Sequence, residues 1–455
     1  MQKKSQIYNQ VNNSENTIFR PIHYLGSKLR ILDFIEDTIN RIDPNKGRVY
    51  DLFSGSVSVS FKLSRTRAVT SVDIQEYSRV ISSALLDTTQ ITDSFIKEFY
   101  KRISLSIYQE NLIWAIDPLI QYEIKCINKA IKGELEDLCS LLENGYIIGF
   151  EKTKEFNGDE TLLKKIKESL KRIKAKSITN KQSIVIRYFG GVYFSYKQAA
   201  QIDAILEEIE MSPIEFRDKL LASLISTISE CVNTVGKQFA QPLRPRKANG
   251  EIKHSLGKIV SEDRSKDIID VFKKWLKKYN SISNSYDNQS LRMDYRDALD
   301  QISKDTTVVY ADPPYTRDHY SRFYHVLETI ALRDSPEIST MKLKGKTVLS
   351  RGLYRIDRHQ SPFCIRSQAM EAFEAIFSKS SLVGAKLVLS YSPYDETKKS
   401  HPRVVTMTQL IELAEKYYSY VEIVSPGNFV HSKLNHAAKH LEASVLAEVL
   451  IVCSN

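Results

Sequence analysis

The residues best suited to chemistry are Asp312-Pro313-Pro314-Tyr315, which join a carboxylate, two prolines and an aromatic ring. Proline fixes φ at about −65° and lacks a backbone N–H donor, so the carbonyl groups of this segment remain free acceptors in a rigid loop. The carboxylate of Asp312 and the carbonyl of Pro313 could each accept one hydrogen of a planar amino group. The ring of Tyr315 could stack on the aromatic ring that carries this amino group. The pattern predicts a site that activates an aromatic amine; a tight surface turn is the alternative for so short a motif.

An apolar run at 306–311 directly precedes this loop and predicts that the loop follows a strand. The same alternation of strand and helix patterns recurs along the chain. We expect strands at 48–53, 68–72, 386–391, 420–424 and 445–453, and helices at 318–332 and 407–417. Such alternation implies an α/β fold with a Rossmann-like, doubly wound, mostly parallel sheet, whose ligands bind at the carboxyl ends of the strands. The loop at Asp312 falls at that edge.

A second candidate loop follows the first predicted strand and contains Asp51, Phe53 and Gly55. Gly55 would let the backbone approach a ligand closely, and the N-terminus of the next helix favours a carboxylate. Asp73 ends the second strand, about where dinucleotide sites carry an acid that binds ribose hydroxyls. An ordinary strand-to-helix turn and a helix N-cap are the alternatives for the glycine loop and for Asp73.

The middle of the chain has a different character. Amphipathic stretches such as 161–174 and 213–232 predict long helices with basic and polar connections. We therefore expect residues 91–290 to form an inserted, mainly helical domain, residues 19–90 and 291–455 to form the catalytic domain, and residues 1–18 to form a loose tail. A length of 455 residues also exceeds the usual size of one domain.

The charge balance favours a polyanionic partner, because 65 Lys and Arg against 55 Asp and Glu give a net charge of +10. The basic loop at 237–258 is the best candidate for contacts with the phosphates and base edges of a nucleic acid, through Lys237, Arg244, Arg246 and Lys247. A solvated basic loop is the alternative. The aromatic, glycine-rich stretch 188–196 predicts either a hydrophobic strand pair or a wedge for an opened duplex.

Several classes of protein are disfavoured. The five cysteines are scattered and show no metal-ligand spacing, so neither a disulfide framework nor a metal site is expected. The polar N-terminus is unlike a signal peptide, and no apolar run is long enough for a membrane helix. The glycine loop lacks a GxGxxG pattern, which disfavours a dehydrogenase. We expect a cytoplasmic protein.

Three segments together resemble the adenine-specific (N6-adenine) DNA methyltransferases of the Dam-like class. The segment around Asp312-Pro313-Pro314-Tyr315 resembles their catalytic motif, residues 24–28 resemble their N-terminal cofactor motif, and residues 51–56 resemble their Asp-x-Phe-x-Gly-x-Gly loop. Val57 stands where that family has its second glycine. We expect this valine to be tolerated if its φ is negative.

The resemblance implies transfer of a methyl group from S-adenosyl-L-methionine, without a metal, to the amino group of an adenine turned out of double-stranded DNA. The implied catalytic residues are Asp312, Pro313, Pro314 and Tyr315. The implied cofactor residues are Tyr24, Gly26, Lys28, Asp51, Phe53, Gly55, Asp73 and Asp297, with Asp294 as the rival of Asp297. Surface charge and core packing are the alternatives for Lys28 and Tyr24.

Other targets and partners stay open. Methylation of the cytosine amino group, or of adenine in RNA, would require a similar geometry. A non-catalytic nucleic-acid-binding module could also retain the loop. Asp312 favours adenine, because the motif of the cytosine class more often begins with serine. The region 91–290 would then be the target-recognition domain. The resemblance also leaves open whether a cognate restriction endonuclease accompanies the protein, in a prokaryotic cell or its phage or plasmid.

Overall fold

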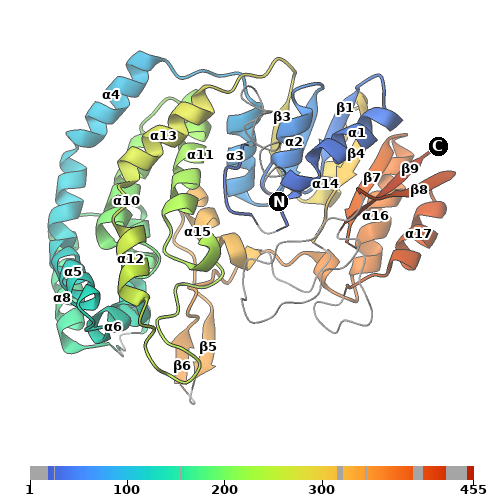
Figure 1. Cartoon of the computed structure of the whole chain (residues 1–455). Helices are drawn as coiled ribbons and strands as arrows, with labels where there is room; N and C mark the ends of the chain where they lie inside the picture. The colour runs from blue at the N-terminus through green and yellow to red at the C-terminus, as the bar shows by residue number, and fades with distance from the viewer. Residues whose placement is uncertain are drawn as a thin grey trace, which may run out of the picture.

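The computed structural model describes residues 19–24, 26–153, 156, 158–314, 321–343, 346–392, 403–426 and 448–455. These residues form a seven-stranded sheet with a body of helices beside it (Figure 1). The tail expected at 1–18 lies outside them. The strands of the sheet are β1 (Arg48–Asp51), β2 (Val69–Asp73), β3 (Gln289–Arg292), β4 (Thr306–Ala311), β7 (Lys386–Tyr391), β8 (Tyr420–Val424) and β9 (Val449–Ser454).

The sheet is mostly parallel, with the order β3-β2-β1-β4-β7-β9-β8. The first five strands of this order pair in parallel, and β9 runs antiparallel between β7 and β8. Side chains alternate between the two faces, so Val49 and Tyr50 on β1 belong to different hydrophobic clusters. The mostly parallel α/β sheet expected from the sequence is confirmed.

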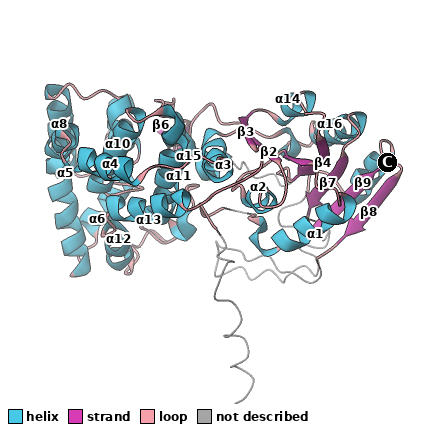
Figure 2. Cartoon of the chain, turned by 90° about the horizontal axis from the view of Figure 1, so that it is seen from above, coloured by secondary structure: helices cyan, strands magenta, loops and turns pink. Residues whose placement is uncertain are grey.

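Helices cover both faces of the sheet (Figure 2). On one face, α1 (Leu32–Ile42) and α2 (Ser58–Leu63) pack on Val49 and Val308. On the other, α14 (Tyr295–Asp300), α16 (Ala369–Leu382) and α17 (Met407–Glu415) pack on Tyr50. Short 3-10 helices are η1 (Lys28–Arg30), η2 (Lys181–Ser183), η3 (Val235–Lys237) and η4 (Pro362–Cys364).

The body of helices lies between β2 and β3 in the sequence. It contains α4 (Asp93–Ser104), α5 (Ile107–Ile131), α6 (Glu136–Asn144), α7 (Ile147–Thr153), α8 (Glu160–Ala175), α9 (Ile184–Tyr188), α10 (Tyr196–Glu210), α11 (Ile214–Cys231), α12 (Leu256–Arg264) and α13 (Ile268–Asn280). Its hydrophobic core continues into α3 (Glu76–Leu86) and α15 (Ser321–Leu332), which border the sheet. The helical body and the sheet region are therefore joined by packed helices rather than by linkers alone.

Part of the chain after α15 also packs on the helical body. Arg333 forms ion pairs with Glu207 and Glu210 of α10. The hydroxyl of Tyr188 donates to the carbonyl of Pro336 at 3.0 Å. The antiparallel hairpin of β5 (Thr340–Leu343) and β6 (Lys346–Leu349) follows and lies beneath the helices in Figure 1. This segment falls within the range expected for the catalytic domain, yet its contacts are with the helices.

The aromatic stretch 188–196 is neither a strand pair nor an exposed wedge. Helix α9 ends at Tyr188, and the chain turns back with an isolated bridge between Gly190 and Phe194 before α10 begins. Gly191 has φ +78°, and a Cβ there would lie 2.6 Å from the hydroxyl of Tyr196. The aromatic rings are buried, so the stretch is a packed turn between two helices.

None of the described helices is both long and apolar enough to cross a membrane. The five cysteines are free of disulfides, and only Cys364 is not fully buried.

Candidate active site

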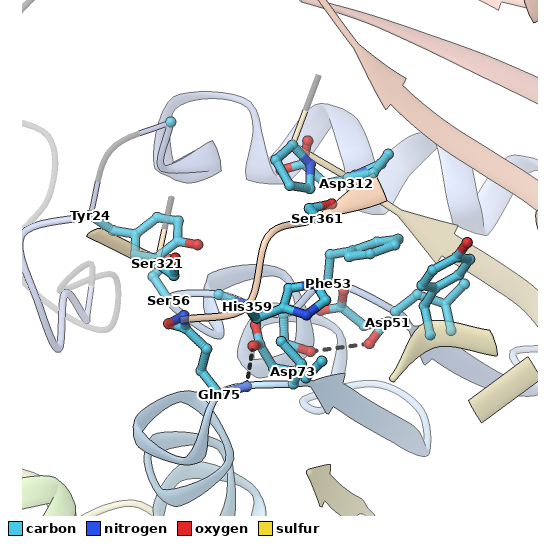
Figure 3. Close-up of a pocket in the computed structure, with 18 of the residues that line it drawn as sticks. Tyr24, Asp51, Phe53, Ser56, Asp73, Gln75, Asp312, Ser321, His359 and Ser361 are labelled. Atoms are coloured by element: carbon cyan, nitrogen blue, oxygen red, sulfur yellow. Dashed lines mark hydrogen bonds between the residues drawn. The ribbon is translucent and has the colours of Figure 1, made fainter. Parts of the chain in front are cut away.

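A cavity lies at the carboxyl ends of β1, β2 and β4, where an open parallel sheet places its ligands (Figure 3). It brings together nearly all the residues expected for cofactor binding and catalysis. Those lining it are Tyr24, Gly26, Lys28, Asp51, Phe53, Gly55, Asp73, Asp312, Pro313 and Pro314. Tyr315 lies outside the described residues, and Asp297 does not line the cavity.

The glycine loop is folded against an aromatic ring. Gly55 has φ +51°, and a Cβ there would lie 2.5 Å from the hydroxyl oxygen of Tyr24. The ring of Tyr24 is stacked on Tyr324 of α15, with centroids 4.7 Å apart. Any side chain at position 55 would displace this stack, so glycine is required here for space as well as for backbone freedom.

Val57 does not meet the condition of a negative φ under which a valine was expected to be tolerated. Its φ is +65°, and it is the N-cap residue of α2. A left-handed conformation costs an L-residue about 1–2 kcal/mol, and it is especially rare for a β-branched side chain. The valine is completely buried, and its N–H donates to the carbonyl of Ser54 at 2.6 Å. The loop thus keeps a glycine-type turn in spite of the valine, held by packing.

Asp73 closes the glycine loop. One carboxylate oxygen accepts from the N–H of Gly55 and the other from the N–H of Gln75, both at 2.9 Å. The N-cap residue of α3 is Gln75, so Asp73 is not a simple helix cap. Burial raises the pKa of Asp73. Each oxygen keeps a second lone pair, so the carboxylate retains acceptor capacity toward the cavity.

Asp51 presents an unsatisfied acceptor. One of its oxygens accepts from the hydroxyl of Ser60 at 2.6 Å, whereas Oδ1 is buried and has no hydrogen-bond partner among the described residues. Burial, with contributions from Asp312 and Asp73, raises the pKa of Asp51 to about 7. A buried acceptor without a partner is costly unless a ligand satisfies it. This oxygen suits a cationic group such as the ammonium of S-adenosyl-L-methionine.

An aromatic wall and an acid complete this half of the cavity. The ring of Phe53 packs against Phe363 and Tyr295, with centroids 5.3 and 5.7 Å away. Asp294 lines the cavity and accepts from the N–H of Arg296 at 2.9 Å. Asp297 stands further along α14, and its side chain is exposed to solvent. Of the two acids, Asp294 is therefore the one placed to meet a ligand.

A buried charge cluster supports Asp312. The ammonium of Lys28 lies 2.8 Å from Asp312 and 2.9 Å from Glu448, and the hydroxyl of Ser390 donates to Glu448 at 2.8 Å. Burial raises the pKa of Asp312 to about 6, with Lys28 lowering it and Glu448 raising it. Lys28 is thus neither surface charge nor a lone cation. Two carboxylates around one ammonium leave the cluster with a net negative charge when all three are ionised.

Sequence reasoning missed Glu448 and the wall formed by residues 359–364. The hint for Glu448 is an acid placed directly before the apolar run of the last strand. The second segment contributes His359, Gln360, Ser361, Pro362 and Cys364 to the cavity, and no local pattern marks it. The thiol of Cys364 lies 3.6 Å from the carbonyl oxygen of Pro314, so this wall touches the loop that begins at Asp312.

The cations predicted to contact DNA are mostly neutralised within the protein. Lys237 pairs with Asp263 and also donates to the carbonyl of Val232. Arg246 lies 3.1 Å from Glu143, and Lys247 lies 2.9 Å from Glu251. Arg244 is exposed and forms no ion pair with a described carboxylate.

The described residues contain no group of three or more His, Cys, Asp or Glu side chains placed to hold a metal ion.

Comparison with known proteins supports this interpretation of the cavity. Residues 24–112 and 259–388 match the family of D12 class N6 adenine-specific DNA methyltransferases. The intervening segment coincides with much of the helical body. Over 452 residues the chain is 24% identical to the modification methylase LlaI of Lactococcus lactis subsp. lactis. The aligned region covers 94% of this chain and 54% of that protein.

A second relative matches a shorter stretch. Over 110 residues, the chain is 33% identical to the type II methyltransferase M.FokI of Planomicrobium okeanokoites, covering 24% of this chain and 15% of that protein. The chain therefore spans about half the length of the first relative and matches a small part of the second. The two family segments contain the glycine loop, Asp73 and Asp312, the residues that meet in the cavity. This chain belongs to the D12 class of N6 adenine-specific DNA methyltransferases.

Proposed function

We propose that the protein transfers the methyl group of S-adenosyl-L-methionine to the exocyclic amino group of adenine in double-stranded DNA, at a specific sequence. The observation that supports this most directly is that Asp312, Pro313 and Pro314 share one cavity with Asp51 and Asp73. The acceptor loop for an amine and the candidate residues for the methyl donor thus face the same space.

The donor half of the cavity suits the parts of S-adenosyl-L-methionine. Asp51 Oδ1 would accept from its ammonium, Asp73 and Asp294 would accept from its hydroxyls, and Phe53 would pack on its ring. When bound, this cofactor supplies a methyl group on a sulfonium, which an amine can attack directly. Gly55 and Tyr24 shape the loop beneath it.

The acceptor loop would prepare the amine. The lone pair of the adenine amino group is delocalised into its ring, so acceptors must hold both N–H groups and turn the nitrogen toward tetrahedral geometry. The carboxylate of Asp312 and the carbonyl of Pro313 would each take one hydrogen. Tyr315 would stack on the base, which must leave the duplex to reach the cavity.

The charge cluster fits the change of charge during transfer. The amino nitrogen becomes positive as it gains the methyl group, and a net negative cluster of Asp312, Lys28 and Glu448 stabilises that charge. Lys28 holds the Asp312 carboxylate in place by an ion pair. Because its pKa is raised to about 6, Asp312 is also a reasonable acceptor for the proton that the nitrogen then releases.

The names of the relatives suggest a setting. One is a modification methylase and the other a type II methyltransferase. We infer that this protein modifies the sites of a restriction system and acts beside a cognate restriction endonuclease. Cells that carry the gene without the endonuclease would then still show complete protection of those sites.

The deciding experiment is expression in cells that lack DNA methylation, followed by sequencing of modified bases in the genome. We expect N6-methyladenine at one recurrent sequence, and none with the Asp312→Ala variant, which keeps its affinity for S-adenosyl-L-methionine by calorimetry. Methylated cytosine would contradict the adenine assignment. A genome without any modified base, from cells that contain folded protein, would contradict the activity, and RNA methylation alone would move the substrate to RNA.

A further inference from the structure

Two arginines, Arg322 and Arg358, contact the ring of Tyr354, and two more, Arg244 and Arg351, lie close to each other nearby. Arg244, Arg322, Arg351 and Arg358 form no ion pair with any carboxylate of the described residues, unlike Lys237, Arg246 and Lys247. The guanidinium carbon of Arg358 lies 4.9 Å from the centre of the Tyr354 ring, and that of Arg322 lies 5.8 Å from it. Both distances suit cation–π contacts.

The guanidinium groups of Arg322 and Arg358 repel each other. The pKa of Arg358 is lowered by burial and by the charge of Arg322, and that of Arg351 is lowered by burial and by Arg244, with Glu143 opposing the effect in part. The Nε atoms of Arg322 and Arg358 are buried and have no hydrogen-bond partner among the described residues. Like charges placed together without a counter-ion are costly in the free protein, and a bound anion would remove that cost.

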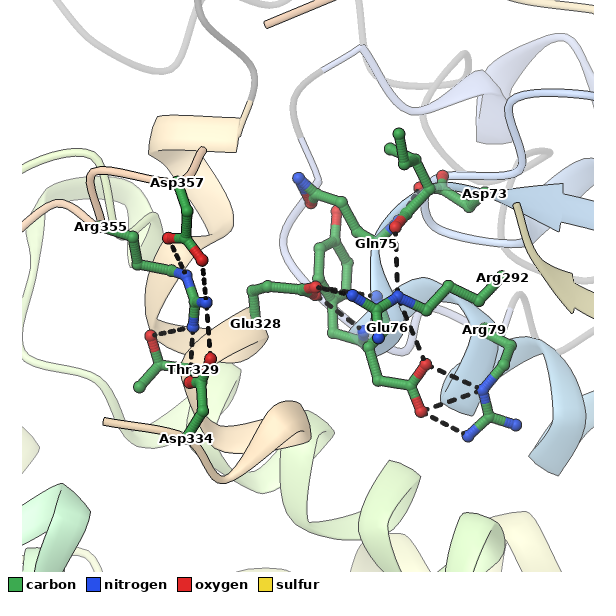
Figure 4. Close-up of polar contacts among 12 residues, drawn as sticks. Asp73, Gln75, Glu76, Arg79, Arg292, Glu328, Thr329, Asp334, Arg355 and Asp357 are labelled. Atoms are coloured by element: carbon green, nitrogen blue, oxygen red, sulfur yellow. Dashed lines mark hydrogen bonds and ion pairs between the residues drawn. The ribbon is translucent and has the colours of Figure 1, made fainter. Parts of the chain in front are cut away.

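The segment that carries Arg351 and Arg358 is held firmly. Arg355 is clamped between Asp334 and Asp357, with nitrogen-to-oxygen distances of 2.6 and 2.8 Å, close to Thr329 of α15 (Figure 4). The hydroxyl of Tyr354 donates to the carbonyl of Ala240. Arg355 is therefore fully compensated and structural. Its neighbour Arg358, three positions along, is fixed in place but not neutralised.

Arg322 and Arg358 are next in the chain to residues that line the active-site cavity. Arg322 follows Ser321, and Arg358 precedes His359; both Ser321 and His359 line the cavity (Figure 3). A nucleic acid that inserts a base into this cavity would bring its backbone close to these two arginines. The anionic group that recurs along that backbone is the phosphate.

Taking DNA as the substrate, as in the proposed function, we propose that Arg322 and Arg358 bind the phosphates that flank the extruded base, with Arg351 and Arg244 extending the site along the strand. A guanidinium group binds phosphate through two parallel hydrogen bonds and can remain stacked on an aromatic ring while it does so. The contact positions the strand and does not read the sequence. The group of Arg322, Arg358, Arg351 and Arg244 thus takes the place of the rest of the 237–258 loop as the main phosphate-binding surface.

The test is the salt dependence of DNA binding, measured by fluorescence anisotropy with a mixed-sequence duplex. We expect Arg322→Gln and Arg358→Gln each to weaken binding and to lower the slope of log K against log salt by about one, because each removes one phosphate contact. Arg358→Lys, which keeps the charge, should retain the wild-type slope. Arg246→Gln is the matched control, because Glu143 already neutralises that arginine, and it should leave the slope unchanged.

Wild-type slopes in both Arg322→Gln and Arg358→Gln would overturn the proposal. So would a lowered slope in Arg246→Gln alone. A slope lowered as much in Arg358→Lys as in Arg358→Gln would also overturn it. Arg322 and Arg358 belong to different segments, so one variant decides if the other fails to fold; unchanged affinity for S-adenosyl-L-methionine verifies folding. Binding is measured apart from catalysis. A wild-type protein that binds DNA through these arginines but methylates no base would contradict the proposed function only.

Discussion

Replacing Glu448 by glutamine should move the acid side of the pH–activity profile to lower pH. Asp312 must be ionised to accept the amino hydrogens, so activity falls as pH drops through its pKa of about 6. Glu448 raises that pKa because its negative charge disfavours a second charge nearby. Glutamine has nearly the same shape and can still accept from Ser390, so the substitution chiefly removes the charge.

The size of the shift follows from the geometry. Both carboxylates contact the ammonium of Lys28, at 2.8 and 2.9 Å, so their oxygens are at most about 6 Å apart. At an effective dielectric constant of about 20, two charges at that separation repel by about 3 kcal/mol, or about two pKa units. Because Lys28 and nearby water can readjust, we expect a shift of about one to two pH units. Activity at pH 5 relative to pH 8 should then rise several-fold.

The assay is incorporation of tritiated methyl groups into unmethylated genomic DNA at saturating cofactor, from about pH 5 to 9. Asp51, whose pKa is about 7, titrates nearby, so the difference between variants carries more information than the position of either profile. Glu422→Gln is a suitable control, because Glu422 of the neighbouring strand β8 pairs with Arg41 and lies away from the cavity. Superimposable acid limbs for wild type and Glu448→Gln, with intact thermal unfolding, would refute the electrostatic role of Glu448.

Two further substitutions test the cofactor half of the cavity. Because Val57 has φ +65°, Val57→Gly should be more stable to urea than Val57→Ala by about 0.5–1 kcal/mol, whereas at Val59, inside α2, glycine should be less stable than alanine by about 1 kcal/mol; the same order at both positions would exclude strain at Val57. Asp73→Ala should weaken binding of S-adenosyl-L-methionine in calorimetry by at least tenfold, because it removes both the acceptor and the brace on Gly55. Unchanged affinity would show that Asp73 has neither role.

Local pattern placed most of the strands and the loops that follow them. Strands β4, β7 and β8 have the expected residues, and β2 is shifted by one residue. Strand β1 ends two residues earlier than expected, β9 was expected to begin outside the described residues, and β3 was not expected. An apolar run that stops at an acid signals both the strand and the position of the acid at its carboxyl end. Parallel strands then bring those ends to one edge, which is why strand patterns group Asp51, Asp73 and Asp312 as neighbours.

The backbone conformation of single residues, and the choice between two nearby acids, could not be predicted from local sequence patterns. The positive φ of Val57 depends on burial of its side chain, which overrides the local preference of a β-branched residue. The sequence favoured Asp297 over Asp294, whereas the start of α14 places Asp294, and not Asp297, at the cavity. The stretch 188–196 has a strand-like composition, yet packing against neighbouring helices makes it a turn.

The class of chemistry is readable from the linear chain, because Asp312-Pro313-Pro314 and the glycine loop carry their function within a few consecutive residues. Which charges are available for that chemistry depends instead on how the chain packs. Glu448 reaches Lys28 from the far end of the chain, and the acids that neutralise Lys237 and Arg246 come from other helices. Pairing of charges depends on distances between segments remote in sequence, so composition could suggest a DNA-binding surface but could not locate it at Arg322 and Arg358.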